Sequence, residues 1–173
     1  MPPRAPLPPE VLSADGGHLY PLLNEGSDFT VIIIALSYLD ACLTSLLSKY
    51  FRKGSTADEL LDANKGALST LTSKASMAYA LGLIDKPMLQ DLLIMARLRN
   101  LVAHSHFELA FQSDELQGLC GELKYIVQLR DAQTGNAVFD LDQGRAPRDK
   151  FVFTAIMLWN RVLLTALDTN HVA

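Results

Sequence analysis

The stretch SDFTVIIIALSYLDACLTSLLSKYFRK, residues 27–53, decides the fold. Its large apolar residues recur at steps of three and four, which is the period of one side of an α-helix. The run TVIII has a local preference for β-structure, but the length and the sustained period favour a helix. Ser27 or Asp28 suits the N-cap, and Gly54 suits the C-terminal end. Because this helix is apolar on most of its circumference, we expect it at the centre of the core.

Five further stretches combine helix-start residues with apolar residues at helical spacing. Gly82 suits a left-handed C-cap, and Asp85 suits the cap of a helix that tolerates Pro87 in its first turn. The predicted helices cover residues 56–64, 68–82, 85–104, 113–129 (with a break near Gly118 or Gly121), and a last stretch that begins at Arg148 or Asp149. Residues 130–147 read as a loop, with a brief extended piece over 137–141. The sequence therefore predicts an all-α, up-and-down bundle of about four long helices plus short helices.

The domain organisation predicted for the 173 residues is a short arm followed by a single domain. Five prolines fall within the first nine residues. Since proline fixes φ and removes a hydrogen-bond donor, residues 1–26 are expected to form a Pro-rich N-terminal arm that is extended or disordered at its start. Residues 27–170 are expected to form one helical domain.

Composition and charge restrict the class of protein. Apolar residues make up 49% of the chain, which is enough for a sizeable core, and the formal net charge is −4. That charge argues against a protein that grips duplex DNA through a basic surface. Cys42 and Cys120 lie in apolar, helix-like contexts and read as buried thiols of a reducing compartment. The start of the chain has no apolar signal core and residues 31–36 are too short to span a bilayer, so we expect a cytoplasmic protein without a membrane contact.

The most polar motif near the core is ARLRNLVAHSH, residues 96–106. Arg99 and His104 are five residues apart, about 140° around a continuous helix, whereas Asn100 and His104 share one side. One interpretation is structural: His104 and Asn100 satisfy polar groups at the end of a helix. The other is metal-independent RNA cleavage, in which His104 is the base, Arg99 holds the phosphate and Asn100 orients either of them. That chemistry needs the helix to fray or tighten after Val102.

A single Arg/His pair is a small catalytic site, so the cleavage hypothesis favours two copies that face each other across a dimer. Leu98, Leu101 and Val102 are suitable neighbours for such a dimer helix. A metal site made of His104, His106 and Glu108 would lack a second ligand cluster and a recognised spacing. We therefore expect no metal and no other cofactor.

Two resemblances rest on these residues. RNLVAH, residues 99–104, is similar to the R-x(4–6)-H signature of HEPN-domain proteins. The longer block GALSTLTSKASMAYALGLIDKPMLQDLLIMARLRNLVAH, residues 66–104, resembles the mannitol operon repressor family, and this likeness extends weakly over about residues 28–125. The resemblances imply a HEPN-like helical fold, a dimer, and negative regulation of mannitol-utilisation genes.

Three functions are open at this point. The first is a transcriptional regulator that acts mainly through a protein partner, because the sequence shows no helix-turn-helix with a basic recognition side. The alternative is a metal-independent HEPN-type endoribonuclease of a toxin or defence system, which uses Arg99 and His104 and takes RNA as its substrate. The third is a ligand- or nucleotide-binding HEPN module without chemistry. A homodimer and a protein partner are expected, and direct DNA binding is not. Fold alone does not choose among these functions.

Overall fold

The structure of the protein is a computed structural model that describes residues 5–104, 110–125, 133–136 and 146–169. The described residues form helices and no strands, so the predicted all-α bundle is confirmed. The helices are α1 (Pro9–Glu25), α2 (Asp28–Tyr50), α3 (Ser55–Leu61), α4 (Leu71–Ala80), α5 (Lys86–His104), α6 (Asp114–Glu122) and α8 (Pro147–Asp168).

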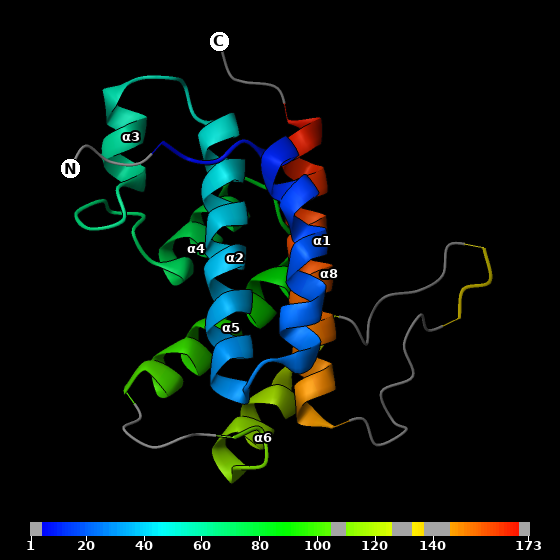
Figure 1. The fold of residues 1–173 in the computed structure, drawn as a ribbon. Helices are drawn as coiled ribbons and strands as arrows, with labels where there is room; N and C mark the ends of the chain where they lie inside the picture. Colours follow the sequence, from blue (N-terminus) through cyan, green and yellow to red (C-terminus); the bar gives the residue numbers. More distant parts are fainter. Residues whose placement is uncertain (1–4, 105–109, 126–132, 137–145, 170–173) are drawn as a thin grey trace.

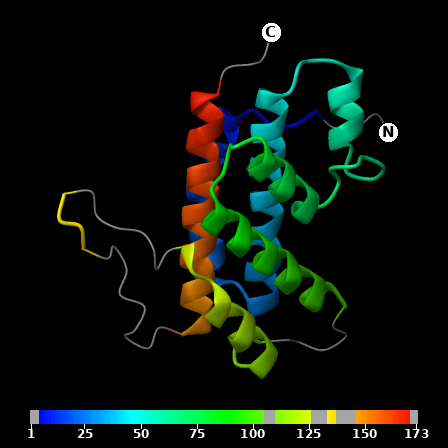
Figure 2. The ribbon, with the colours of Figure 1, turned by 180° about the vertical axis from the view of Figure 1, so that it is seen from behind.

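Helix α2 lies at the centre of the bundle, as its apolar circumference predicts. It contacts α1, α3, α4, α5 and α8, and it packs most extensively against α8 (Figure 1). Ten of its residues are buried, among them Ile32, Leu36, Leu39, Leu43 and Leu46. Helices α2 and α8 run side by side in the same direction, and α1 runs in the opposite direction beside them. Seen from behind, α5 crosses α2 obliquely and α6 covers the lower end of the bundle (Figure 2).

The predicted caps of α2 are half right. Ser27 is the N-cap, and its hydroxyl accepts a hydrogen bond of 3.3 Å from the backbone N–H of Thr30. The helix ends at Tyr50, with Phe51 as its C-cap. Gly54, which we expected to end this helix, instead precedes α3 as its N-cap. A short connection therefore separates the two helices.

The connection between α4 and α5 follows its sequence signals. Gly82 has a φ of 72°, and its N–H donates to the carbonyl of Tyr79. The N–H of Leu83 donates to the carbonyl of Ala78, which completes a Schellman turn. Asp85 then accepts a side-chain hydrogen bond from the N–H of Met88 at 2.9 Å. The predicted end of one helix and start of the next are both confirmed.

Helix α6 is shorter than predicted. It ends at Glu122, with Leu123 as its C-cap, and residue 125 is helical again, so the predicted break occurs just after Gly121 and not at Gly118. The brief extended piece predicted over residues 137–141 lies outside the described residues. Within the predicted loop, Gly135 has a φ of 68° and lies in an exposed turn.

Residues 9–25, which are part of the predicted Pro-rich arm of residues 1–26, form helix α1. Pro8 is its N-cap and Pro9 occupies the first turn, where a missing N–H costs nothing. The helix also contains Pro21. Leu12 and Leu23 are only 2% and 1% exposed, because α1 packs against α2 and α8. Tertiary packing therefore outweighs the low helix propensity of the Gly and Pro residues.

Adjacent glycines in α1 provide a matched test of this packing. A Cβ at Gly16 would lie 3.0 Å from the Oη of Tyr38, whereas a Cβ at Gly17 would meet nothing within 4 Å. We expect Gly17→Ala to raise the free energy of unfolding by about 0.5–1 kcal/mol, because alanine is the better helix former. Gly16→Ala should gain less than this or destabilise the protein. Urea unfolding of both variants measures the difference, and equal gains would contradict the α1–α2 contact.

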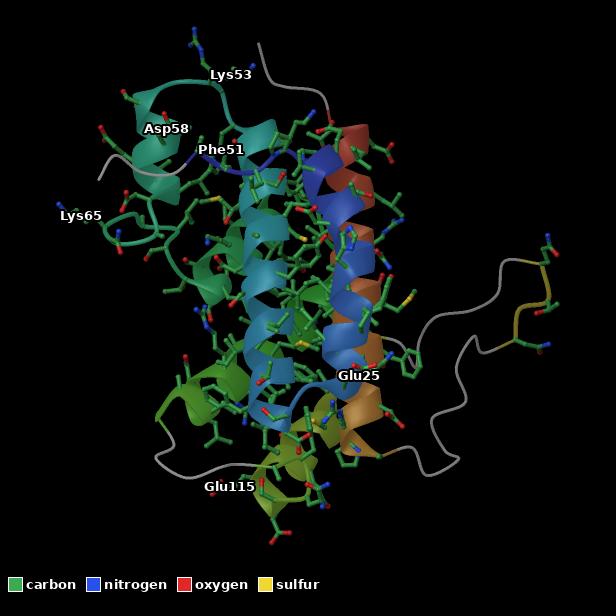
Figure 3. All side chains as sticks on the ribbon, viewed as in Figure 1. Glu25, Phe51, Lys53, Asp58, Lys65 and Glu115 are labelled. Atoms are coloured by element: carbon green, nitrogen blue, oxygen red, sulfur yellow. The ribbon has the colours of Figure 1, made fainter. Side chains whose placement is uncertain are left out.

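Two helices, α2 and α8, are long and apolar enough to cross a membrane by length and composition alone, with hydropathies of 1.9 and 1.4. About half of each apolar window, 56% and 50%, is buried inside the protein. Both are core helices that pack on each other. Figure 3 shows side chains filling the space around α2, with labelled charged residues such as Lys53, Lys65 and Glu115 at the periphery. The core thus accounts for the buried half of each apolar window.

Candidate functional site

The motif singled out in the sequence lies at the C-terminal end of α5. The helix continues through His104, so the Cα positions of Arg99 and His104 are about 140° apart around its axis. Arg99 is half-buried and Asn100 is exposed. Asn100 lies one turn before His104 on the same side of the helix. The fraying on which a close Arg99–His104 pair depends does not occur before residue 104.

Arg97, two residues before Arg99, joins α5 to α6. Its Nη1 donates to the Oε2 of Glu122 at 3.1 Å. The side chains are 60% and 52% exposed, so water screens the pair and it contributes less than about 1 kcal/mol. The exposed end of α5 therefore presents an ion pair, the Arg99 guanidinium and the Asn100 amide as its polar groups.

The residues expected to form a dimer interface next to the motif lie in the protein's own core. Leu98 is 0% exposed and Val102 is 2% exposed, and both belong to the central apolar cluster. Leu101 is partly buried against the same cluster. Because α5 uses this side to pack against α2 and α4, Leu98 and Val102 are not free to contact a second subunit. The sequence alone did not distinguish an inner from an outer apolar stripe.

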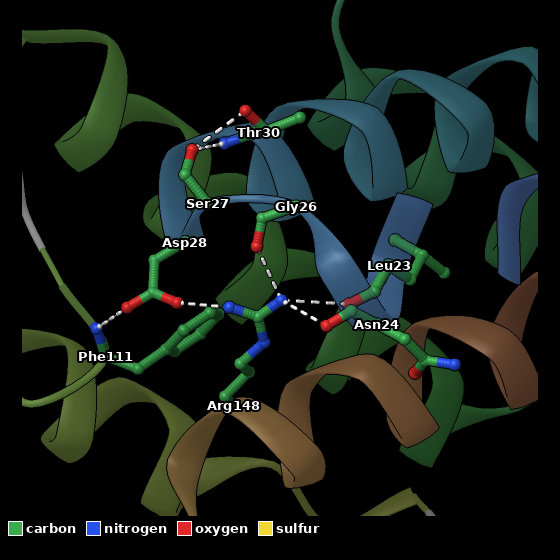
Figure 4. A network of polar contacts seen from close by, with 8 residues as sticks. All are labelled: Leu23, Asn24, Gly26, Ser27, Asp28, Thr30, Phe111 and Arg148. Carbon is green, nitrogen blue, oxygen red and sulfur yellow. Dashed lines mark hydrogen bonds and ion pairs between the residues drawn. The ribbon is translucent and has the colours of Figure 1, made fainter. Parts of the chain in front are cut away.

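The chain that follows α5 is anchored at Phe111 by a polar clamp made of Asp28 and Arg148 (Figure 4). The Oδ2 of Asp28 accepts a hydrogen bond of 2.9 Å from the backbone N–H of Phe111. Its Oδ1 accepts from the Nη1 of Arg148 at 2.7 Å. The aromatic ring of Phe111 packs against Phe151 with a centroid separation of 5.4 Å. The clamp therefore fixes the point at which the chain returns to the bundle beyond the motif.

Arg148 also closes the C-terminal end of α1. Its Nη2 donates to the carbonyl oxygens of Leu23, Asn24 and Gly26 at 3.1, 3.1 and 2.7 Å. Carbonyls at the end of a helix have no partners within the helix, and a guanidinium both donates to them and interacts favourably with the helix dipole. One side chain of α8 thus joins the end of α1 to the start of α2.

A second polar joint connects α5 to the residues after α6. Asp91 of α5 is 0% exposed, and its carboxylate accepts hydrogen bonds from the backbone N–H groups of Lys124 and Tyr125 at 2.8–3.1 Å. Lys150 of α8 lies close enough to act on its charge, and its Nζ donates to the carbonyl of Gly121 at 2.9 Å. Asp91 therefore positions the corner between α6 and Tyr125 against the same helix that carries the motif.

Asp91 should make stability depend on pH. Burial raises the pKa of its carboxyl above the ordinary 3.8, and the N–H donors and the Lys150 charge only partly oppose this. A raised folded pKa means that the Asp91 contribution is complete below about pH 4 and is lost as pH rises through the folded pKa. We expect the wild type to gain stability relative to Asp91→Asn as pH falls from neutral towards about 4. Urea unfolding at a series of pH values measures the difference, with the exposed Asp58→Asn as control. Parallel pH profiles would contradict it.

The remaining reactive groups do not assemble a second site within the part of the chain that the structure describes. No group of three His, Cys, Asp or Glu side chains suited to a metal ion occurs among the described residues, and His106 and Glu108 lie outside them. Cys42 and Cys120 are free and buried, and burial raises the pKa of both thiols, so they are inert at neutral pH.

The joints built on Asp28, Asp91 and Arg148 were missed in the sequence as functional positions. A usable signal exists only for Asp91. It falls on the buried side of α5, in line with Met88, Met95 and Leu98, where an unpaired carboxylate would be costly.

Together the helices define the class: an all-α bundle protein with one apolar core and a polar motif at one helix end. The chain belongs to the mannitol repressor family, MtlR, whose family model matches residues 18–158. It is similar to the mannitol operon repressor of Escherichia coli (strain K12), with 31% identity over 113 residues that make up 62% of this chain and 57% of the relative. The repressor of Escherichia coli O6:H1 matches with the same figures.

A solved structure gives the same assignment. The chain is similar to one described as the X-ray structure of the MtlR–HPr complex from Escherichia coli, with a TM-score of 0.64 and 25% identity. The likeness covers 86% of this chain and 98% of that chain. The sequence match, by contrast, spans a little over half the length of the curated relatives.

Proposed function

We propose that this protein regulates mannitol-utilisation genes and acts mainly through contacts with other proteins rather than by reading DNA. The observation that carries the proposal is the match to the mannitol repressor family over residues 18–158. The curated relatives are named as mannitol operon repressors. We place this activity in the cytoplasm.

The partner that we propose is an HPr protein. The similar solved structure is of MtlR in complex with HPr, and the likeness to it extends over 86% of this chain.

The placement of positive charge supports protein contacts over direct DNA reading. Among the described residues, Lys49, Lys74, Arg97 and Arg148 each form an ion pair with a carboxylate. Arg148 and Lys74 are also largely buried. A protein that neutralises several phosphates needs cations that are exposed and aligned. The formal net charge of −4 also opposes attraction to a polyanion such as DNA.

Calorimetric titration tests the partner. The purified chain is titrated with HPr from the same genome and, separately, with the HPr of Escherichia coli; the Escherichia coli MtlR–HPr pair is the positive control. We expect saturable binding to at least one HPr. The partner assignment is refuted if neither binds at concentrations that saturate the control pair. A gel shift with mannitol-operon DNA over a salt series tests whether the protein binds DNA directly. Tight, steeply salt-dependent binding would contradict the proposal that it acts through other proteins.

The endoribonuclease alternative, with Arg99, Asn100 and His104 as its site, stays a prediction. The course of α5 does not favour it, because the helix continues through His104 and places the backbone positions 99 and 104 about 140° apart around its axis. The purified protein, Arg99→Ala and His104→Ala are incubated with RNA in the absence of metal. We expect no cleavage by any of the three. Cleavage by the wild type that is lost in both variants would replace the regulatory proposal with the enzymatic one.

A further inference from the structure

Helix α8 has an apolar stripe on the side that faces away from the core. The core side carries Leu158, Val162 and Ala166, each 0% exposed. The outer side carries Leu164 and Leu167, which are 54% and 40% exposed. Met157 and Asn160 lie on the same outer side. We call the four residues Met157, Asn160, Leu164 and Leu167 the α8 seam.

The spacing of the α8 seam is that of a helix pair. Its residues follow one another at steps of three, four and three, the period of the central positions in a two-helix coiled coil. Such positions are normally covered by a partner helix, but here they are half-buried or exposed.

Opposite charges flank the α8 seam along one edge. Arg161 and Asp168 directly follow Asn160 and Leu167, and both are exposed. Seven residues separate them, so they lie within about 20° of each other around the helix and about 10.5 Å apart along it. Within the described ranges neither side chain takes part in an ion pair or a hydrogen bond. The edge therefore carries two unpaired charges of opposite sign.

We propose that the α8 seam packs against the α8 seam of a second copy of this chain, with the two helices antiparallel. In an antiparallel pair, the edge of one helix that carries Arg161 and Asp168 lies beside the same edge of the partner helix. With the two-fold axis beside Leu164 and Thr165, Arg161 of each copy meets Asp168 of the other and Leu164 and Leu167 lie at the centre of the contact. The patch is therefore complementary to itself. In a parallel pair, Arg161 and Asp168 would instead face the opposite edge of the partner helix, which lies next to the core and is apolar. The charges thus select the antiparallel arrangement.

A hollow of about 490 Å³ beside the α8 seam provides room for side chains of the second copy. It is lined on one side by Met157, Asn160, Arg161 and Leu164 of α8, and on the other by Asp85, Pro87 and Tyr125. A contact centred on one helix is smaller than the roughly 800 Å² per partner of a standard interface. The dimer should therefore be weak and depend on concentration.

Sedimentation velocity over a roughly hundredfold range of concentration tests the proposal. The wild type should shift from monomer to dimer. Arg161→Glu and Asp168→Arg should each weaken dimerisation by about tenfold or more, because each homodimer then contains two like-charge pairs. An equimolar mixture of the two variants should dimerise as well as the wild type, because both pairs are opposite again. The double variant should also recover.

Two further variants separate the interface from general effects. Leu164→Asp should abolish the dimer, and Arg52→Glu, an exposed charge reversal outside α8, should leave it unchanged; circular dichroism establishes that each variant is folded. A wild type that stays monomeric throughout overturns the proposal. So does a mixture of Arg161→Glu and Asp168→Arg that dimerises no better than either variant alone. Neither HPr nor DNA is present, so the outcome is independent of the regulatory function proposed above.

Discussion

Replacing Lys74 by alanine is expected to lower the free energy of unfolding by about 3 kcal/mol. The side chain of Lys74 is 2% exposed, and its Nζ lies 2.6 Å from the Oδ2 of Asp40, which joins α4 to α2. The other carboxylate oxygen of Asp40 is buried without a hydrogen-bond partner among the described residues. Removal of the ammonium therefore leaves a largely buried carboxylate with no neutralising charge. Urea unfolding of the wild type and Lys74→Ala measures the loss.

The paired variant Asp40→Leu with Lys74→Met is the matched control. It removes both charges and the unsatisfied oxygen while it keeps most of the side-chain volume, so we expect a stability within about 1 kcal/mol of the wild type or above it. Lys74→Met alone should be nearly as damaging as Lys74→Ala. If the single and double variants lose the same amount, the cost lies in packing and not in the unpaired carboxylate.

Arg148→Ala should lower the free energy of unfolding by about 2–4 kcal/mol. The variant leaves Asp28, whose side chain is 18% exposed, without its cation, and it removes the donor to three carbonyls at the end of α1. Arg148→Lys keeps the charge but lacks the planar fork that reaches these acceptors together, so we expect it to recover only part of the loss. Thermal unfolding by circular dichroism compares the two. Equal stability of Arg148→Ala and the wild type would contradict the clamp.

The sequence predicted helices best where apolar spacing, caps and turns agree. The α4–α5 connection is right because Gly82, Asp85 and Pro87 each have a local effect on the backbone. Helix α1 was missed because its prolines and glycines oppose a helix locally. Its formation depends on contacts of Leu12 and Leu23 with distant helices, which no local pattern contains.

The candidate site was located in the sequence but not assembled. Residues 97–104 do lie at the end of a helix. The partners that define their surroundings come from elsewhere: Glu122 pairs with Arg97, and Asp91 holds the corner after α6. Which apolar stripe of α5 or α8 faces inward is also a property of the packed bundle. Spacing alone marked Leu98 and Leu164 in the same way, although one is buried and the other is 54% exposed.

The Asp28–Arg148 contact has a consequence for how the chain folds. The two residues are 120 positions apart, so their meeting closes most of the polypeptide into one loop, and contacts of such high sequence separation form late. A bond that is absent from the transition state slows unfolding without speeding folding. We therefore expect Arg148→Ala to shorten the kinetic lifetime of the native protein by raising the unfolding rate, while the refolding rate stays close to that of the wild type.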